Sequence, residues 1–189
     1  DLAIPVFVKR MFRHSYIYKN IHAGITQPSD LNGKRVGLQG WFTSAAIWAR
    51  GMLEDEWGVD VRSIHWVAER GDGIENWRAP EWLKLEILPK GVKQFDLLAQ
   101  GEIAAAMHTG LWAPRVHPNI DFLFPDYNAL ERDYYRRTGL FPIMHTLLVR
   151  DAVLAAHPWV AMSLFNAWME SKRRCYQRLE WQQIGRAHV

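Results

Sequence analysis

Hydrophobic positions along the chain switch repeatedly between short continuous runs and helical spacing. Short apolar runs bounded by glycine, proline or polar residues predict strands at 3–8, 16–18, 35–38, 64–68, 83–88, 103–107, 120–124 and 143–149. Apolar residues at helical spacing predict helices at 43–57, 95–99, 129–138 and 159–179. The polar segment 69–82 predicts a long loop. Strands that alternate with helices indicate an α/β protein, and no internal repeat interrupts the pattern.

The stretch from Gly33 to Gly51 reads as strand, loop and helix. Thr43 or Ser44 is the expected N-cap of the helix, directly after a strand that ends near Gln39, and Gly58 is expected to end the helix. Hydroxyls, free backbone N–H groups and the positive end of the helix dipole would meet there, which suits a carboxylate or another anion. The structural alternative is an ordinary capped connection, since no glycine-rich phosphate motif is present.

Composition excludes several classes of protein. Hydrophobic residues make up 49% and charged residues 23% of 189 residues, values that exclude general disorder. A net charge of +3 without a long basic run argues against nucleic acid as a partner. No apolar run approaches the length of a membrane span. The single cysteine, Cys175, excludes an internal disulfide and a cysteine zinc site, and it fits a cytoplasmic location.

The two ends of the chain suggest a processed fragment. The chain begins at Asp1 and enters an apolar strand almost at once, as expected for a piece of a longer protein. Its last six residues, IGRAHV at 184–189, correspond to the translation of a common sequencing-adapter read. We therefore expect these six residues to be an adapter-derived tail that packs against nothing.

Several motifs together resemble a known family. They are FRHS at 12–15, DLNGKRVG at 30–37, WARG at 48–51, GEI at 101–103, LFPD at 123–126 and TGLFPIMH at 138–145. The chain resembles the 4,5-dihydroxyphthalate decarboxylase family, most specifically through FRHS and TGLFPIMH. The resemblance implies a truncated, two-lobed type 2 periplasmic-binding-protein-like fold with a ligand cleft between the lobes. We expect residues 1–32 and 138–183 in lobe 1, which is discontinuous and incomplete, and residues 33–137 in lobe 2.

The same resemblance implies a function. It is the non-oxidative, cofactor-independent decarboxylation of a dihydroxylated aromatic carboxylate, as in 4,5-dihydroxyphthalate to protocatechuate and CO₂ during phthalate breakdown. The expected partner is a small aromatic carboxylate, the expected location is the cytoplasm, and a homo-oligomer is left open. The alternative is a periplasmic solute-binding protein of an ABC importer for a small anionic or aromatic ligand, which would share the fold. The runs QGWFT at 39–43 and MHTG at 107–110 depart from the family pattern, so the exact substrate stays open.

Loss of CO₂ from such a ring requires an acid, a base and a group that holds the remaining carboxylate. Histidine transfers protons near neutral pH, and arginine binds a carboxylate through two hydrogen bonds. We predict His14 and His145 as catalytic residues that face a common pocket the size of one aromatic ring. The predicted substrate-binding residues are Arg13, Ser15, Gln39, Trp41, Thr43, Ser44 and Thr109.

Each candidate also has a structural interpretation. His14 would be a hydrogen-bonded loop residue, His145 a histidine of the core, and Trp41 a packing residue. His108 is intermediate between a functional and a structural role. The other histidines, at positions 22, 65, 117 and 157, are expected on the surface or at caps, because none has the spacing of a metal ligand. No metal site or cofactor is predicted.

Overall fold

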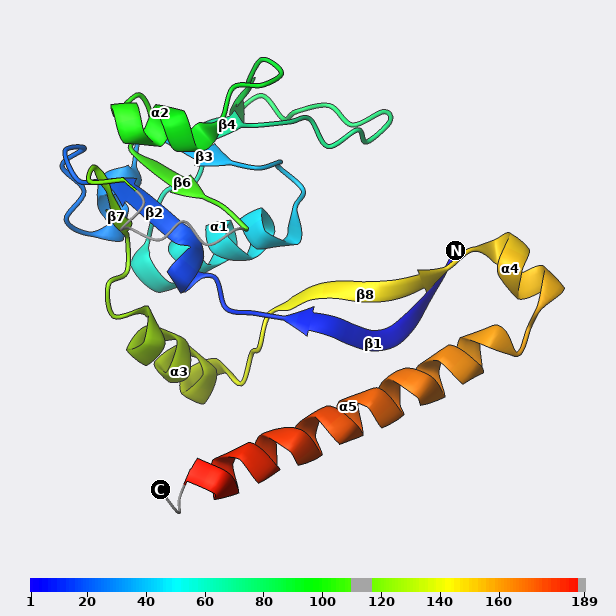
Figure 1. The fold of residues 1–189 in the computed structure, drawn as a ribbon. Helices are drawn as coiled ribbons and strands as arrows, with labels where there is room; N and C mark the ends of the chain where they lie inside the picture. The colour runs from blue at the N-terminus through cyan, green and yellow to red at the C-terminus, as the bar shows by residue number, and fades with distance from the viewer. Residues whose placement is uncertain (110–116, 187–189) are drawn as a thin grey trace. The chain divides into compact units, whose positions relative to one another are not determined.

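The computed structural model describes residues 1–109 and 117–186, with side chains described up to residue 179 (Figure 1). The chain divides into two units. Unit 1 contains Asp1–Arg10 and Ile143–Val189, and unit 2 contains Met11–Pro142. Each unit has its own sheet and its own hydrophobic core.

Unit 2 is built on a mixed sheet of six strands in the order β5-β4-β3-β6-β2-β7. The strands are β2 (Ile17–Asn20), β3 (Arg35–Leu38), β4 (His65–Ala68), β5 (Lys84–Ile87), β6 (Ala105–Met107) and β7 (Ile120–Phe122). Strands β3 to β6 are mutually parallel, whereas β2 lies antiparallel between β6 and β7. The carboxyl ends of β3 and β6 and the amino end of β2 therefore meet at one edge of the sheet.

Helices cover both faces of this sheet, α1 (Ser44–Trp57) on one and α2 (Gln94–Gln100) on the other (Figure 1). The alternation of the strands explains the two cores, because Val36 and Leu38 pack in the cluster of α1 whereas Val67 packs in that of α2. Gly37 faces α2 at close range. A Cβ atom there would lie 2.7 Å from Gln94 Oε1 of α2 and 2.8 Å from the Ile103 side chain, so a larger residue would displace these two side chains.

The connections of the sheet diverge between β3 and β6. Strand β3 leads through α1 to β4 on one side, whereas β5 returns through α2 to β6 on the other side of β3. In open α/β sheets, ligands bind outside the carboxyl ends of the strands at such a point of divergence. A ligand site is therefore expected at the residues that directly follow β3 and β6.

The described part of unit 2 contains three further helical segments. They are η1 (His14–Tyr16), η2 (Pro28–Leu31) and α3 (Tyr127–Thr138). Thr43 caps α1 by accepting a hydrogen bond from the Ala46 N–H at 3.4 Å, and Gly58 ends the helix in the left-handed region at φ 61°. Both caps were expected from the sequence.

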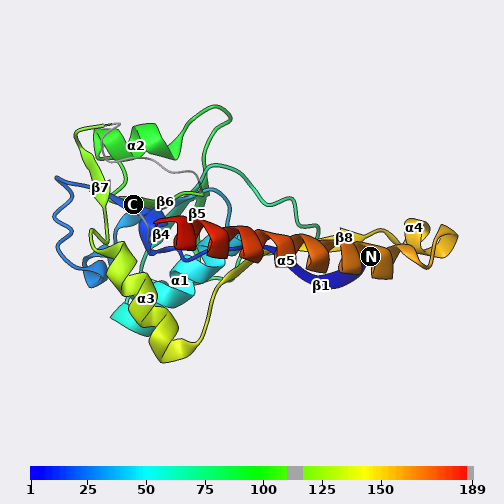
Figure 2. The same cartoon turned by 60° about the horizontal axis from the view of Figure 1, so that its bottom comes forward.

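Unit 1 contains an antiparallel pair of strands, β1 (Leu2–Arg10) and β8 (Ile143–Val149), followed by α4 (Asp151–Ala156) and α5 (Val160–Arg186). Helix α5 runs along β1 (Figure 1, Figure 2). The buried side chains Ile4, Val6 and Val149 pack against Leu164, Phe165 and their neighbours. An apolar cavity of about 300 Å³ between β1 and α5 is lined by Leu2, Ala3, Ile4, Pro5, Ala161, Met162 and Phe165.

The α/β class is confirmed, and the predicted strands and helices are present with small changes at their ends. Helix α4 was not predicted, and α5 continues past the predicted end at 179 to Arg186. The helix thus includes 184–186 of the expected tail, while 187–189 lie outside the described residues; the packing of the tail stays a prediction.

The division of the chain differs from the predicted one over residues 11–32. These residues are predicted in lobe 1, but β2 pairs with β6 and β7 and so joins this segment to unit 2. The chain consequently leaves unit 1 after Arg10 rather than near residue 33, and it returns at Ile143. Within the described residues, no helix is long and apolar enough to cross a membrane.

Candidate functional site

Three polar side chains form a chain of contacts at the carboxyl edge of the unit 2 sheet. Gln39 directly follows β3, and His108 and Thr109 directly follow the neighbouring parallel strand β6. Gln39 Nε2 lies 3.1 Å from His108 Nε2, and the Thr109 hydroxyl donates to Gln39 Oε1 at 2.5 Å. The structure thus brings together the predicted residues Gln39 and Thr109, and it adds His108.

The direction of these hydrogen bonds follows from the chemistry of the groups. A threonine hydroxyl donates to Oε1 of Gln39, which leaves the amide Nε2 facing the imidazole. The amide nitrogen Nε2 of Gln39 can only donate, so Nε2 of His108 accepts, and the proton of a neutral imidazole is then on Nδ1. This arrangement orients His108 through Gln39 and Thr109.

The amino end of β2 and the segment η1 lie at the same edge. The backbone N–H of His108 donates to the Tyr16 carbonyl at 3.1 Å, and the Arg13 guanidinium lies 5.0 Å from the centre of the Tyr16 ring. Arg13 is only 4% exposed. Burial lowers the pKa of Arg13, while Tyr16 acts in the opposite direction, and the guanidinium remains charged.

The amino end of α1 is the predicted anion cradle, and it already has an acidic neighbour. Besides capping α1, the Thr43 hydroxyl donates to the Gly40 carbonyl at 3.0 Å, and Ser44 is the first helical residue. Asp72, from the loop between β4 and β5, lies against Gly40, where a Cβ atom would be 2.6 Å from Asp72 Oδ1. Asp72 therefore adds negative charge at the site where the sequence predicted a bound anionic ligand. No pattern in its loop indicated this contact.

Arg50 supplies the opposite charge beside the cradle. Its Nη1 donates to the Trp41 carbonyl at 2.8 Å, and its guanidinium lies 3.6 Å from the centre of the Trp41 ring. Burial lowers the pKa of Arg50 to about 10, and Asp72 opposes that effect. Trp41 also meets the Trp66 ring edge to face at 5.9 Å and is 9% exposed. These contacts favour the packing role that was the alternative for Trp41.

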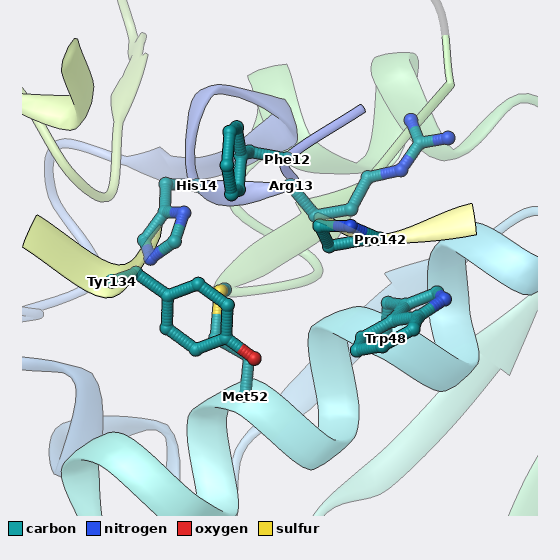
Figure 3. A pocket seen from close by; sticks show the side chains of 7 residues that line it. All are labelled: Phe12, Arg13, His14, Trp48, Met52, Tyr134 and Pro142. Atoms are coloured by element: carbon teal, nitrogen blue, oxygen red, sulfur yellow. The ribbon is translucent and has the colours of Figure 1, made fainter. Parts of the chain in front are cut away.

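His14 lies in an apolar pocket within unit 2. Figure 3 shows its ring beside Tyr134, with Met52 and Trp48 contributed by α1. The rings of Trp57, Phe124 and Tyr134 surround the imidazole at 5.6 to 5.8 Å, and His14 is 1% exposed. The cavity measures about 10 Å³, room for one water at most. An aromatic ring does not fit in this cavity of unit 2, and the predicted pocket shared by His14 and His145 stays a prediction.

Electrostatics agree with this burial. Desolvation lowers the pKa of His14 to about 4, Glu56 acts to raise it, and Arg137 acts to lower it further. The imidazole is consequently neutral at neutral pH, and its Nδ1 has no hydrogen-bond partner among the residues that the structure describes. The carboxylate of Glu131 is 3.9 Å from Nδ1, but it faces a neutral ring rather than a cation.

Glu131 instead fastens η1 to α3. Its Oε1 accepts from the Ser15 N–H at 3.3 Å and from the Ser15 hydroxyl at 3.1 Å. Burial raises the pKa of Glu131, and the two bonds from Ser15 oppose that rise. Ser15, predicted to bind substrate, thus makes an internal contact that holds the segment bearing Arg13.

His145 belongs to unit 1, where it is exposed and opposite Lys9 in the β1–β8 pair. His14 belongs to unit 2, so the predicted convergence of the two histidines stays a prediction. No group of three or more His, Cys, Asp or Glu side chains that could hold a metal occurs in the described residues.

Known proteins resemble this chain in sequence. No protein-family model matches the chain. It is 40% identical over 187 residues to 4,5-dihydroxyphthalate decarboxylase of Comamonas testosteroni, covering 94% of this chain and 56% of that protein. It is 33% identical over 146 residues to 4,5-dihydroxyphthalate decarboxylase of Pseudomonas putida, covering 71% of this chain and 55% of that protein. The chain is related in sequence to the 4,5-dihydroxyphthalate decarboxylases.

This relationship confirms the resemblance inferred from the motifs. The chain spans about half the length of these curated decarboxylases. Among solved structures, the periplasmic aliphatic sulphonate binding protein of Escherichia coli matches 97% of this chain and 53% of its own length. The sequence identity is 15% and the TM-score 0.37.

Sequence reasoning left His108 undecided and did not single out Asp72 or Glu131. One signal for His108 was available: it directly follows a buried parallel strand, as Gln39 does. Asp72 and Glu131 lie in a polar loop and on a polar helix, where acidic residues are common and carry no local signal.

Proposed function

We propose that the protein containing this chain is a non-oxidative decarboxylase that converts 4,5-dihydroxyphthalate to protocatechuate and CO₂. The observation that carries the proposal is the polar chain of Gln39, His108 and Thr109 at the divergence point of the sheet. Sequence similarity to two proteins named for this reaction supports the choice of substrate. A two-lobed fold of the type 2 periplasmic-binding-protein kind and a cytoplasmic location belong to the same proposal.

The reaction needs a bound carboxylate and a proton. A hydroxyl para to the departing carboxylate pushes electron density onto the ring carbon, which takes up a proton as CO₂ leaves. In this proposal Arg13 and the amino end of α1, with Thr43 and Ser44, bind the carboxylate that stays on the ring. The position of Arg13 favours this role, because its guanidinium lies beside the Tyr16 ring and the Tyr16 backbone is hydrogen-bonded to His108 at the end of β6.

Of the two histidines predicted for proton transfer, His145 keeps a proposed role, as the base of the reaction. The 1% exposure of His14 and its cavity of about 10 Å³ favour a structural role for that residue. His14 packs beside Arg13 and so stabilises the segment from which the arginine extends.

The test is CO₂ release from 4,5-dihydroxyphthalate by the protein in its full natural length, with protocatechuate formation followed in parallel. Phthalate, which lacks the hydroxyls, is the control and should bind without turnover. Stoichiometric CO₂ and protocatechuate are the expected result. Tight binding of 4,5-dihydroxyphthalate without turnover would overturn the proposal and favour a solute-binding protein.

A further inference from the structure

The imidazole of His108 lies where open α/β sheets bind their ligands, next to the carboxyl end of a parallel strand. It lies at the carboxyl edge of the sheet, is half-buried, and contacts Gln39 through Nε2 at 3.1 Å. We propose that His108 delivers the proton to the substrate ring carbon, with Gln39 and Thr109 as its positioning residues. This inference rests on the proposed decarboxylase function and assigns the acid of that reaction.

A proton donor must be held well both before and after it gives up its proton, and Gln39 can do this. Beside a neutral His108, the amide Nε2 donates to the imidazole, as observed. Beside a protonated His108, the carboxamide turned by half a rotation presents Oε1 to Nε2–H of the ring. Thr109 can hydrogen-bond the Gln39 carboxamide in either orientation, because its hydroxyl donates to Oε1 as observed and can equally accept from the amide N–H.

The proposed step balances in atoms and charge. Protonated His108 gives the proton on the ring nitrogen that does not face Gln39 to the carbon bearing the carboxylate. The bond from that carbon to the carboxylate then breaks, its electron pair returns to the ring, and CO₂ leaves. The neutral ring left behind carries its remaining proton on Nε2, which Gln39 Oε1 accepts, and Nδ1 takes a proton from water before the next turnover. No oxidant, reductant or further reactant is consumed.

The surroundings of Arg13 and His14 explain why the acid is assigned to the β6 end. His108 is joined to Tyr16 by a backbone hydrogen bond of 3.1 Å, and Tyr16 lies next to the Arg13 guanidinium. A substrate carboxylate on Arg13 would therefore place the ring near His108. His14 follows Arg13 in the chain but is enclosed by rings, so it has no path to that substrate.

The first experiment replaces His108 with glutamine in the full-length protein. In His108→Gln we expect kcat to fall about 10² to 10⁴-fold, the usual contribution of a positioned acid, while the Kd of phthalate changes less than about 3-fold. His22→Gln is the matched control, since His22 is exposed in a loop remote in sequence from these strand ends. Wild-type turnover in His108→Gln would overturn the inference and leave the decarboxylase function standing.

Two further variants separate proton transfer from a structural effect. In His108→Ala, added imidazole should restore part of kcat, because it can supply the missing acid. If imidazole does not raise kcat at saturating substrate, in a variant that still binds phthalate, the inference is contradicted.

The variant Gln39→Glu tests the positioning role of Gln39. Its fixed carboxylate acceptor favours protonated His108 and should move the alkaline limb of the pH profile of kcat upward by about one pH unit. An unshifted profile contradicts the role of Gln39 even where His108 variants fold poorly. Absence of CO₂ release in the unaltered protein would instead remove the proposed function itself, and this inference with it.

Discussion

His14 and His108 flank the same pair of antiparallel strands, yet their surroundings differ in nearly every respect. His14 precedes β2 and is packed among Trp57, Phe124 and Tyr134. His108 follows β6 and is held by an amide that a hydroxyl orients. Being next to a strand end is therefore not sufficient for function. The polar partners and the access of a ligand decide which histidine can transfer a proton.

The comparison also shows how burial acts on a histidine. Around His14 the apolar rings remove water and lower the pKa to about 4, so the residue stays neutral over the physiological range. Such a group stabilises the fold by packing. A histidine that cycles between two protonation states needs a neighbour that can accept as well as donate, and a carboxamide is such a neighbour.

The largest expected effect concerns the stability of the fold in acid. The pKa of His14 is about 4 in the folded state and 6.5 in the unfolded state, so the unfolded state binds the proton first as the pH falls. Stability should be lost between pH 6.5 and 4, by up to about 3 kcal/mol at 1.36 kcal/mol per pH unit. The free energy of unfolding, measured by urea titration across this range, checks the prediction.

His14→Phe isolates this contribution of His14. The variant should lose most of the pH dependence between 6.5 and 4, whereas the exposed control His22→Gln should retain it. Glu131 acts with the opposite sign, because burial raises its pKa and its protonation in acid favours the folded state. A slope in His14→Phe equal to that of the unaltered protein would show that other groups cause the acid sensitivity.

A smaller effect is expected at the contact between η1 and α3. Glu131→Ala removes the acceptor for both the N–H and the hydroxyl of Ser15, and it should cost about 1 to 3 kcal/mol of stability. Glu131→Gln keeps an oxygen acceptor and should recover most of that loss. Urea unfolding at pH 7 measures both variants, and equal stability of the two would refute a role for these hydrogen bonds.

The next prediction concerns the polar chain at the carboxyl edge of the sheet. Thr109→Val removes the hydroxyl that donates to Gln39 Oε1 with little change of shape. The orientation of Gln39 becomes less fixed, so kcat/KM should fall about 2 to 10-fold, corresponding to one hydrogen bond of about 0.5 to 1.5 kcal/mol. Steady-state CO₂ release measures this loss. Thr109→Ser keeps the hydroxyl and should remain near the starting activity.

The smallest expected effect comes from the acidic neighbour of the anion cradle. Asp72→Asn removes a negative charge beside Gly40 and should tighten phthalate binding about 2 to 5-fold, as expected for the loss of a partly solvated repulsion. Glu75→Gln, an exposed change in the same loop, is the matched control. Calorimetry at low and high salt checks this. A gain that does not shrink with salt would point away from charge repulsion.

The sequence by itself determined the α/β class and the approximate position of most elements. Apolar periodicity located the strands and most helices, and Thr43 and Gly58 marked both ends of α1, because caps depend on residues close in the chain. The motifs FRHS and TGLFPIMH pointed to the 4,5-dihydroxyphthalate decarboxylases, and sequence similarity confirmed that relationship. Gln39 and Thr109 were also selected from the sequence, and they do meet.

Only the tertiary structure decided which strand ends share an edge. The pairing of β2 between β6 and β7 moved residues 11–32 into unit 2 and placed Tyr16 next to His108. The same packing enclosed His14 among aromatic rings and brought Asp72 against Gly40. Local patterns show which face of an element is apolar, but they do not specify its neighbour. Strand order and burial arise from contacts between residues far apart in the chain, and these contacts distinguish a packed histidine from one that can act on a substrate.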